Sequence, residues 1–134
     1  MSTSELEIYA LQLGADCPFF IENTPKHVEG IGDIMSSIDL DLSEYNIKLI
    51  DPEIHISTKE AYANVVPRKP KSSVKEILES PIKQWKDKLN NDFERSTFQR
   101  HIGIRHLKDR LYKEGAIYSS MTGSGSVLFG LFYK

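Results

Sequence analysis

The chain has 134 residues, of which 40% are hydrophobic and 27% charged, a composition typical of a globular domain that builds its own core. Its 17 Lys and Arg residues are nearly balanced by 19 Asp and Glu residues, and the formal net charge of -2 excludes a global field that recruits nucleic acid or an anionic membrane. Cys17 is the single cysteine, which excludes an intramolecular disulfide. No apolar run approaches the ~20 residues of a transmembrane helix and no signal peptide is visible, so we expect a cytoplasmic protein.

Regular structure is predicted at both ends of the sequence. Ser4 and Glu7 have the spacing of a capping box and precede apolar residues at helical spacing, so a helix should begin almost at the first residue. Gly14 should end this helix as a cap with positive φ. A strand is predicted over 126–133, directly before the last residue. Such ends fit an excised domain, and a natural single domain can also have them.

Between these ends the sequence predicts short elements joined by turns. In the first half we expect an extended segment at 18–21, strands at 26–29 and 46–50, a turn at 29–33, and a short helix through Tyr62 capped by Ser57 or Thr58. In the second half we expect a linker at 67–71, helices at 73–78 and 82–89, a long helix over about 93–112 capped by Asn91 or Asp92, and strands at 116–121 and 127–132. The order predicts one α+β domain over 1–134, with an antiparallel sheet packed against helices.

Asp16 is the first candidate for chemistry. It follows the expected helix cap and precedes Pro18, so its carboxylate should be held rigidly. A carboxylate held in this way can accept a proton from a substrate hydroxyl or orient that hydroxyl. The structural alternative is an Asx turn, in which the carboxylate bonds its own backbone.

A glycine-rich hairpin tip is the second candidate. The backbone N–H groups of Gly123, Ser124 and Gly125 could face an anion. The tip is not a P-loop, because it lacks the lysine and is followed by a strand rather than a helix. The alternative is a tight hairpin that needs glycine for positive φ.

The third candidate is the pair of Thr58 and Tyr62, which lie four residues apart and so share one face of a short helix. A projecting tyrosine at this position could stack on a planar ligand. The alternative is that Tyr62 belongs to the core.

The histidines predict no metal site. His101 and His106 are five residues apart and point to different helical faces, and no cysteine or carboxylate stands at metal-ligand spacing from the others. The cations of the predicted long helix are interpreted as a solvated face, since acidic residues lie among them.

Five segments occur in an order that resembles one family: LQLGADCPFF, EGIGD, DPEIHISTKEAY, NDFE and SSMTGSGSVLFGLF. From about Glu5 to Phe132 the sequence is similar to the 4-(cytidine 5'-diphospho)-2-C-methylerythritol kinases. These belong to the superfamily of galactose, homoserine, mevalonate and phosphomevalonate kinases. The resemblance implies a ferredoxin-like arrangement for this part of the kinase.

The resemblance also implies a reaction, in which the γ-phosphoryl of ATP, with Mg²⁺, is transferred to a hydroxyl of a cytidine-diphosphate-linked methylerythritol in non-mevalonate isoprenoid biosynthesis. Asp16 falls on the family's catalytic aspartate. Thr58 matches a hydroxyl residue near the reacting groups, and Tyr62 matches the aromatic residue that packs against the cytosine. Gly123, Ser124 and Gly125 match the third superfamily motif beside the phosphates. Cys17 stands where valine is common in the family, a change of little consequence.

Finally, the resemblance implies that residues 1–134 are the C-terminal, substrate-side domain, because nothing in them matches the family's N-terminal ATP-binding domain. We therefore expect this chain alone to show no kinase activity and to hold neither ATP nor Mg²⁺ tightly. Apolar surface left uncovered near Phe19, Phe20 and the terminal strand should favour self-association. The competing hypothesis is a non-catalytic ferredoxin-like module for ligand binding or interaction.

Overall fold

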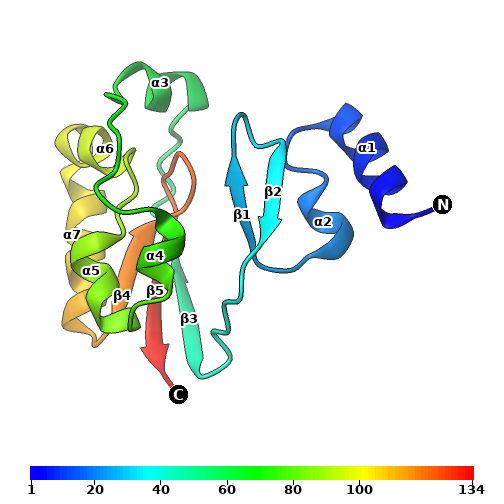
Figure 1. The fold of residues 1–134 in the computed structure, drawn as a ribbon. Helices are drawn as coiled ribbons and strands as arrows, with labels where there is room; N and C mark the ends of the chain where they lie inside the picture. The colour runs from blue at the N-terminus through cyan, green and yellow to red at the C-terminus, as the bar shows by residue number, and fades with distance from the viewer. The chain divides into compact units, whose positions relative to one another are not determined.

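The computed structural model describes all residues, 1–134, and the chain divides into two compact units, residues 1–41 and residues 42–134. Figure 1 shows the helices and strands of both units in chain order. No helix is long and apolar enough to cross a membrane. The treatment of 1–134 as one domain stays a prediction.

The first unit contains two helices and a hairpin: α1 (Thr3–Leu13), α2 (Phe19–Glu22), β1 (Lys26–Glu29) and β2 (Ile34–Ser37). The capping box of α1 is formed by Ser2 and Glu5, not by Ser4 and Glu7 as predicted. The Ser2 N–H donates to Glu5 Oε2 at 2.6 Å, and this backbone hydrogen bond lowers the pKa of Glu5. Both pairs have the same spacing, so the sequence pattern did not distinguish them.

Helix α1 ends at Gly14 as predicted, but φ there is 169°, which is extended backbone rather than positive φ. The extended segment predicted at 18–21 is wrong, because Phe19–Glu22 form α2. Pro18 has helical angles, φ -59° and ψ -32°, and the Asn23 N–H closes the helix on the Phe19 carbonyl at 2.9 Å. The fixed φ of proline suits the first turn of a helix as well as an extended chain.

The hairpin of the first unit confirms the strand predicted at 26–29 and the turn at 29–33. Strands β1 and β2 pair antiparallel from Lys26 and Ser37 to Glu29 and Ile34. Strand β2 (IMSS) was not predicted, because its two apolar residues are adjacent and are followed by two serines, so they show no alternation.

The second unit is built on a three-stranded antiparallel sheet of β3 (Tyr45–Ile50), β4 (Tyr118–Met121) and β5 (Leu128–Tyr133), in the order β3-β5-β4. The sheet confirms the predicted strand at 46–50, the hairpin and the α+β class. Strand β5 is central and buries Leu128 and Leu131. Apolar side chains are nevertheless exposed near it, at Tyr133 on β5 and at Ile47 and Leu49 on the neighbouring edge strand β3.

The helices of the second unit are α3 (Thr58–Ala63), α4 (Val74–Leu78), the 3-10 turn η1 (Ile82–Gln84), α5 (Trp85–Lys88), α6 (Glu94–Arg100) and α7 (Ile102–Lys113). The helices expected at 58–62 and 73–78 are confirmed, whereas 82–89 is a 3-10 turn followed by α5. The prediction of a single long helix over about 93–112 is wrong, because His101, with φ -126° and ψ 73°, separates α6 from α7. Apolar spacing continues across this break, so periodicity did not reveal it.

A helix covers one face of the sheet in the second unit, whereas the other face is covered beside β4 but left open at β3, where Ile47 and Leu49 are exposed. Helix α7 covers one face, where Ile104, Leu111 and Leu128 are fully buried. On the other face the Trp85 ring of α5 meets the Tyr118 ring edge-on, with centroids 5.7 Å apart. Burial raises the pKa of Tyr118 to about 12.

One buried carboxylate joins three elements of the second unit. Glu94 lies in the first turn of α6 and is only 7% exposed. Its Oε1 accepts from the Met121 N–H at 2.8 Å and from Ser120 Oγ at 3.2 Å, while Lys108 Nζ of α7 donates to Oε2 at 2.6 Å. Glu94 therefore connects α6, α7 and the end of β4.

We predict that Glu94→Ala lowers the free energy of unfolding by about 3 kcal/mol or more, because it leaves the Lys108 ammonium without a counter-ion and the Met121 N–H without an acceptor. Glu94→Gln should cost less, since its amide oxygen can still accept from Met121. Urea unfolding measures both, with Glu79→Ala on the surface as the control that should not change stability. A Glu94→Ala variant as stable as the parent would contradict this account.

Candidate functional site

Asp16 lies in the turn between α1 and α2, where the Cys17 N–H donates to the Gly14 carbonyl at 3.1 Å. The Asp16 side chain is exposed, and its carboxylate accepts no hydrogen bond from the chain. The Asx-turn alternative is therefore wrong. The carboxylate is free to interact with a ligand.

An apolar hollow of about 320 Å³ adjoins Asp16 and is lined by Phe19, Phe20, Val28 and Met35. Phe19 and Phe20 meet edge-on with ring centroids 5.2 Å apart, and Phe20 is 69% exposed. The hollow thus places an unpaired carboxylate beside an apolar wall formed by α2 and the hairpin.

The EGIGD turn, residues 29–33, lies against the same site. A Cβ at Gly32 would be 3.5 Å from the Ala15 Cβ and 3.8 Å from Asp16 Oδ1. The backbone at Gly32 therefore approaches the Asp16 turn closely. A Cβ at these distances would make ordinary van der Waals contact, and it is the positive φ of 102° that favours glycine at position 32.

Helix α3 carries the predicted pair of Thr58 and Tyr62. Its N-cap is Ser57, whose Oγ accepts from the Glu60 N–H at 3.1 Å. Thr58 is exposed, and Tyr62 is 64% exposed. The Tyr62 ring meets the edge of Phe93 with centroids 5.0 Å apart and an interplanar angle of 73°. The alternative that Tyr62 belongs to the core is therefore wrong.

Arg100 fixes α3 to α6 through both ends of its guanidinium group. Its Nη1 donates to Glu60 Oε1 at 2.9 Å, and its Nη2 donates to Asn64 Oδ1 at 2.8 Å. Two parallel hydrogen bonds from a planar group restrict orientation as well as distance. The helix that carries Tyr62 is therefore held in a defined place in the second unit.

The glycine-rich tip between β4 and β5 requires positive φ, as the hairpin alternative proposed. φ is 48° at Gly123 and 97° at Gly125, and a Cβ at Gly125 would lie 2.7 Å from the Met121 sulfur. The Gly125 N–H donates to the Thr122 carbonyl at 2.9 Å, and the Ser126 hydroxyl donates to the Ile54 carbonyl. Figure 1 shows this tip, in red, beside the segment that leads to α3.

Asn91 contacts the tip, a role that the sequence analysis missed. Its Nδ2 donates to the carbonyls of Met121 and Gly123, both at 2.8 Å, while its Oδ1 accepts from the Phe93 N–H at 2.9 Å. The N-cap of α6 is Phe93, without a side-chain cap, so the predicted cap at Asn91 or Asp92 is wrong; the Oδ1 of Asn91 instead accepts from the turn before the helix. The other two partners are about thirty residues away in the sequence, so no local pattern could indicate them.

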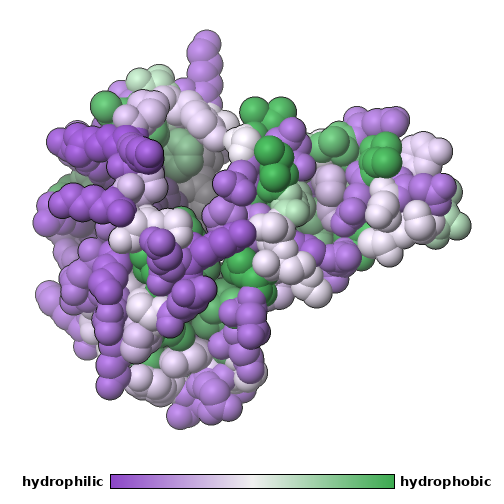
Figure 2. Space-filling model, viewed as in Figure 1, coloured by the Kyte–Doolittle hydropathy of each residue, from purple (hydrophilic) through white to green (hydrophobic).

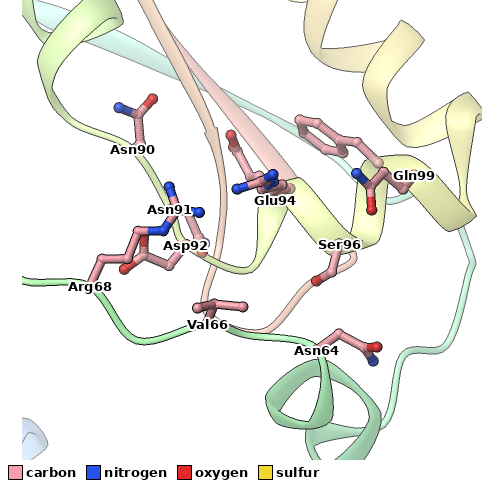
Figure 3. A pocket seen from close by; sticks show the side chains of 11 residues that line it. Asn64, Val66, Arg68, Asn90, Asn91, Asp92, Glu94, Ser96 and Gln99 are labelled. Carbon is pink, nitrogen blue, oxygen red and sulfur yellow. The ribbon is translucent and has the colours of Figure 1, made fainter.

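A groove of about 540 Å³ lies beside Asn91, between the coil 64–68 and residues 90–99 (Figure 3). Its lining is mixed: the carboxamides of Asn64, Asn90 and Gln99 and the guanidinium of Arg68 lie beside the apolar side chains of Val66 and Phe98. Such groups suit hydrogen bonding to uncharged or anionic ligand atoms. The structure contains no group of three or more His, Cys, Asp or Glu side chains that could hold a metal ion.

Comparison with known proteins identifies this architecture. Residues 73–134 match the family model described as GHMP kinases C terminal. The chain also superimposes with a TM-score of 0.80 on a crystal structure of 4-(cytidine 5'-diphospho)-2C-methyl-D-erythritol kinase, at 27% identity over 94% of this chain and 47% of that chain. Residues 73–134 are therefore similar to the C-terminal part of the GHMP kinases, and the chain shares the fold of the solved kinase, which confirms the expected α+β fold and the resemblance.

Among the GHMP kinases, the curated relatives of this chain share the name of one particular enzyme. The chain is 52% identical to 4-diphosphocytidyl-2-C-methyl-D-erythritol kinase of Azobacteroides pseudotrichonymphae genomovar. CFP2, over 100% of this chain and 51% of that protein. It is 50% identical to the protein of the same name from Bacteroides thetaiotaomicron, over 98% of this chain and 48% of the relative. The chain spans about half the length of these curated relatives. The resemblance found in the sequence is thus confirmed.

Proposed function

We propose that this chain supplies the C-terminal half of a kinase that transfers the γ-phosphoryl of ATP to a hydroxyl of 4-diphosphocytidyl-2-C-methyl-D-erythritol, a step in isoprenoid biosynthesis. The observation that carries the proposal is the 52% identity, over the full chain, to a kinase named for that substrate. The residues that bind ATP are assigned to the half of the kinase that lies outside the match to this chain.

Asp16 is the proposed base. The substrate hydroxyl oxygen forms a bond to the γ-phosphorus, the bond from that phosphorus to the oxygen shared with the β-phosphate breaks, and ADP leaves. The hydroxyl proton passes to the Asp16 carboxylate. The exposed position of Asp16 and its lack of an internal hydrogen-bond partner support this role.

Tyr62 and Thr58 are the proposed contacts to the acceptor. The exposed Tyr62 ring offers a π-face to the cytosine, and Phe93 supports it from one side. The Thr58 hydroxyl, one helical turn away, can donate to or accept from a polar group of the same substrate. These roles assign nucleobase recognition to α3.

The tip at Gly123, Ser124 and Gly125 is the proposed phosphate-side loop. The Gly125 N–H is already occupied by the Thr122 carbonyl, whereas those of Gly123 and Ser124 donate to no backbone carbonyl. Two free N–H groups next to each other suit a phosphate oxygen.

The chain is also proposed to self-associate when it is separated from the rest of the kinase. Apolar side chains are exposed on both units, including Phe20 on the first and Ile47 and Leu49 on the second. Hydrophobic side chains, in green, are visible at the surface in Figure 2. Exposed apolar patches and an uncovered edge strand favour association.

We predict that Asp16→Asn in the full-length protein lowers kcat by at least ~10²-fold while the melting temperature stays unchanged, because the carboxylate acts in proton transfer and is not needed for packing. ADP release with the cytidine-linked substrate measures kcat. Asp39→Asn, another exposed carboxylate of the first unit, is the matched control and should leave activity intact. Activity of Asp16→Asn within a few-fold of the parent would contradict the assignment.

We further predict that Tyr62→Ala weakens binding of the cytidine-linked substrate by about 1 to 3 kcal/mol, the scale of base stacking on an aromatic ring, and that Tyr62→Phe has a small effect. Titration calorimetry on the full-length protein measures the affinity. Tyr9→Ala, on an exposed helix of the first unit, controls for loss of a surface aromatic ring. If Tyr62→Ala binds the substrate as tightly as the parent, nucleobase recognition lies elsewhere.

A further inference from the structure

A single four-residue segment, Asn91–Glu94, contacts both parts of the proposed substrate site in the second unit. The glycine-rich tip lies on one side of it and Tyr62 on the other. We propose that Asn91 and Phe93 are positioning residues, Asn91 for the phosphate-side tip and Phe93 for the nucleobase-side tyrosine. This inference rests on the proposed function and deepens it.

The contacts to the tip are directional. Asn91 Nδ2 lies 2.8 Å from both the Met121 and the Gly123 carbonyl oxygens, one at the end of β4 and the other within the tip. Both hydrogens of one amide group are thereby used on one turn. Since Gly123 and Ser124 carry the free N–H groups, the orientation of those donors depends on where Asn91 holds the turn.

The contact to the tyrosine is aromatic. Phe93 is partly buried against the core of the second unit, so its ring is fixed, whereas Tyr62 is 64% exposed. The two rings meet edge-to-face with centroids 5.0 Å apart, a favoured geometry for an aromatic pair. Phe93 therefore limits the positions that the Tyr62 ring can take before a base stacks on it.

Hydrogen bonds made by its own residues hold the segment Asn91–Glu94 in place. Asn91 Oδ1 accepts from the Phe93 N–H at 2.9 Å, so the two positioning side chains share one turn of backbone. Glu94 then fixes that turn through its buried contacts to Lys108 and to the Met121 N–H. Figure 3 shows Asn91 and Glu94 close to the groove that borders this turn. Asp92 is exposed and makes no hydrogen bond to the chain, so it is a matched control.

The arrangement has a consequence for substrate choice. A nucleoside diphosphate that carries its acceptor hydroxyl on the far side of the diphosphate must place its base and its reacting end at a fixed separation. A tip and a base platform held by one rigid turn favour ligands of that length.

The test compares Asn91→Asp, Phe93→Leu and Asp92→Asn in the full-length protein, with steady-state kinetics for ATP and for the cytidine-linked substrate. Asn91→Asp keeps the Oδ1 acceptor and removes the donor to the tip, so kcat should fall by about tenfold to a hundredfold with the KM for the cytidine-linked substrate unchanged. Phe93→Leu should raise that KM by about tenfold with kcat unchanged. Asp92→Asn should match the parent.

We expect Asn91→Asp to change kcat alone and Phe93→Leu to change the KM for the cytidine-linked substrate alone. A purely structural role would not produce this difference, because a loss of stability lowers the amount of active protein and affects the kinetics with both substrates alike. Equal effects of Asn91→Asp and Phe93→Leu on both substrates, or no effect of either, would overturn the inference while the parent remains active. An inactive parent would instead contradict the proposed function. Should Phe93→Leu not fold, Phe93→Met fills a similar volume without a ring and takes its place.

Discussion

The buried carboxylate of Glu94 is the interaction on which the arrangement of the second unit depends. It accepts hydrogen bonds from an α7 lysine, from a β4 backbone amide and from a serine hydroxyl, so both of its oxygens have partners away from water. A buried charge is tolerated only when it is paired and hydrogen-bonded in this way. These contacts join α6, which carries Glu94, to α7 and β4. The position of each element therefore depends on the other two. The end of β4, and with it the glycine-rich tip, is fixed as a result.

This constraint relates the stability of the second unit to its proposed chemistry. Asn91 and Phe93 lie within three residues of Glu94, and they contact the tip and the Tyr62 ring respectively. The same turn therefore serves packing and ligand placement. The first unit has a different design, in which Asp16 lies unpaired in a turn beside an apolar hollow. A carboxylate without internal partners contributes little to folding, and for that reason it is available to a substrate.

Much of the fold could be predicted from local patterns, and the failures have physical causes. The helices at Thr58–Ala63 and Val74–Leu78 were predicted because their start signals are local, and of the two caps considered for the first, Ser57 or Thr58, the structure has Ser57. The helix at Phe19–Glu22 was missed because proline suits two conformations, and the break at His101 because apolar spacing continues across it. The candidate residues followed from the order of motifs, whereas the contacts of Asn91 with the tip and of Glu94 with the end of β4 join residues about thirty positions apart. Contacts between residues so far apart in the sequence are decided by tertiary packing, which the spacing of apolar residues along the chain does not indicate.

The most direct test of the central claim, that one turn holds a base platform and a phosphate-side loop, is a crystal structure of the full-length protein with the cytidine-linked substrate bound. The account predicts the cytosine stacked on the Tyr62 ring, with Phe93 still edge-on to that ring, and a phosphate oxygen within hydrogen-bond distance of the N–H groups of Gly123 or Ser124. Cytosine bound away from Tyr62, with no phosphate at the tip, would contradict it.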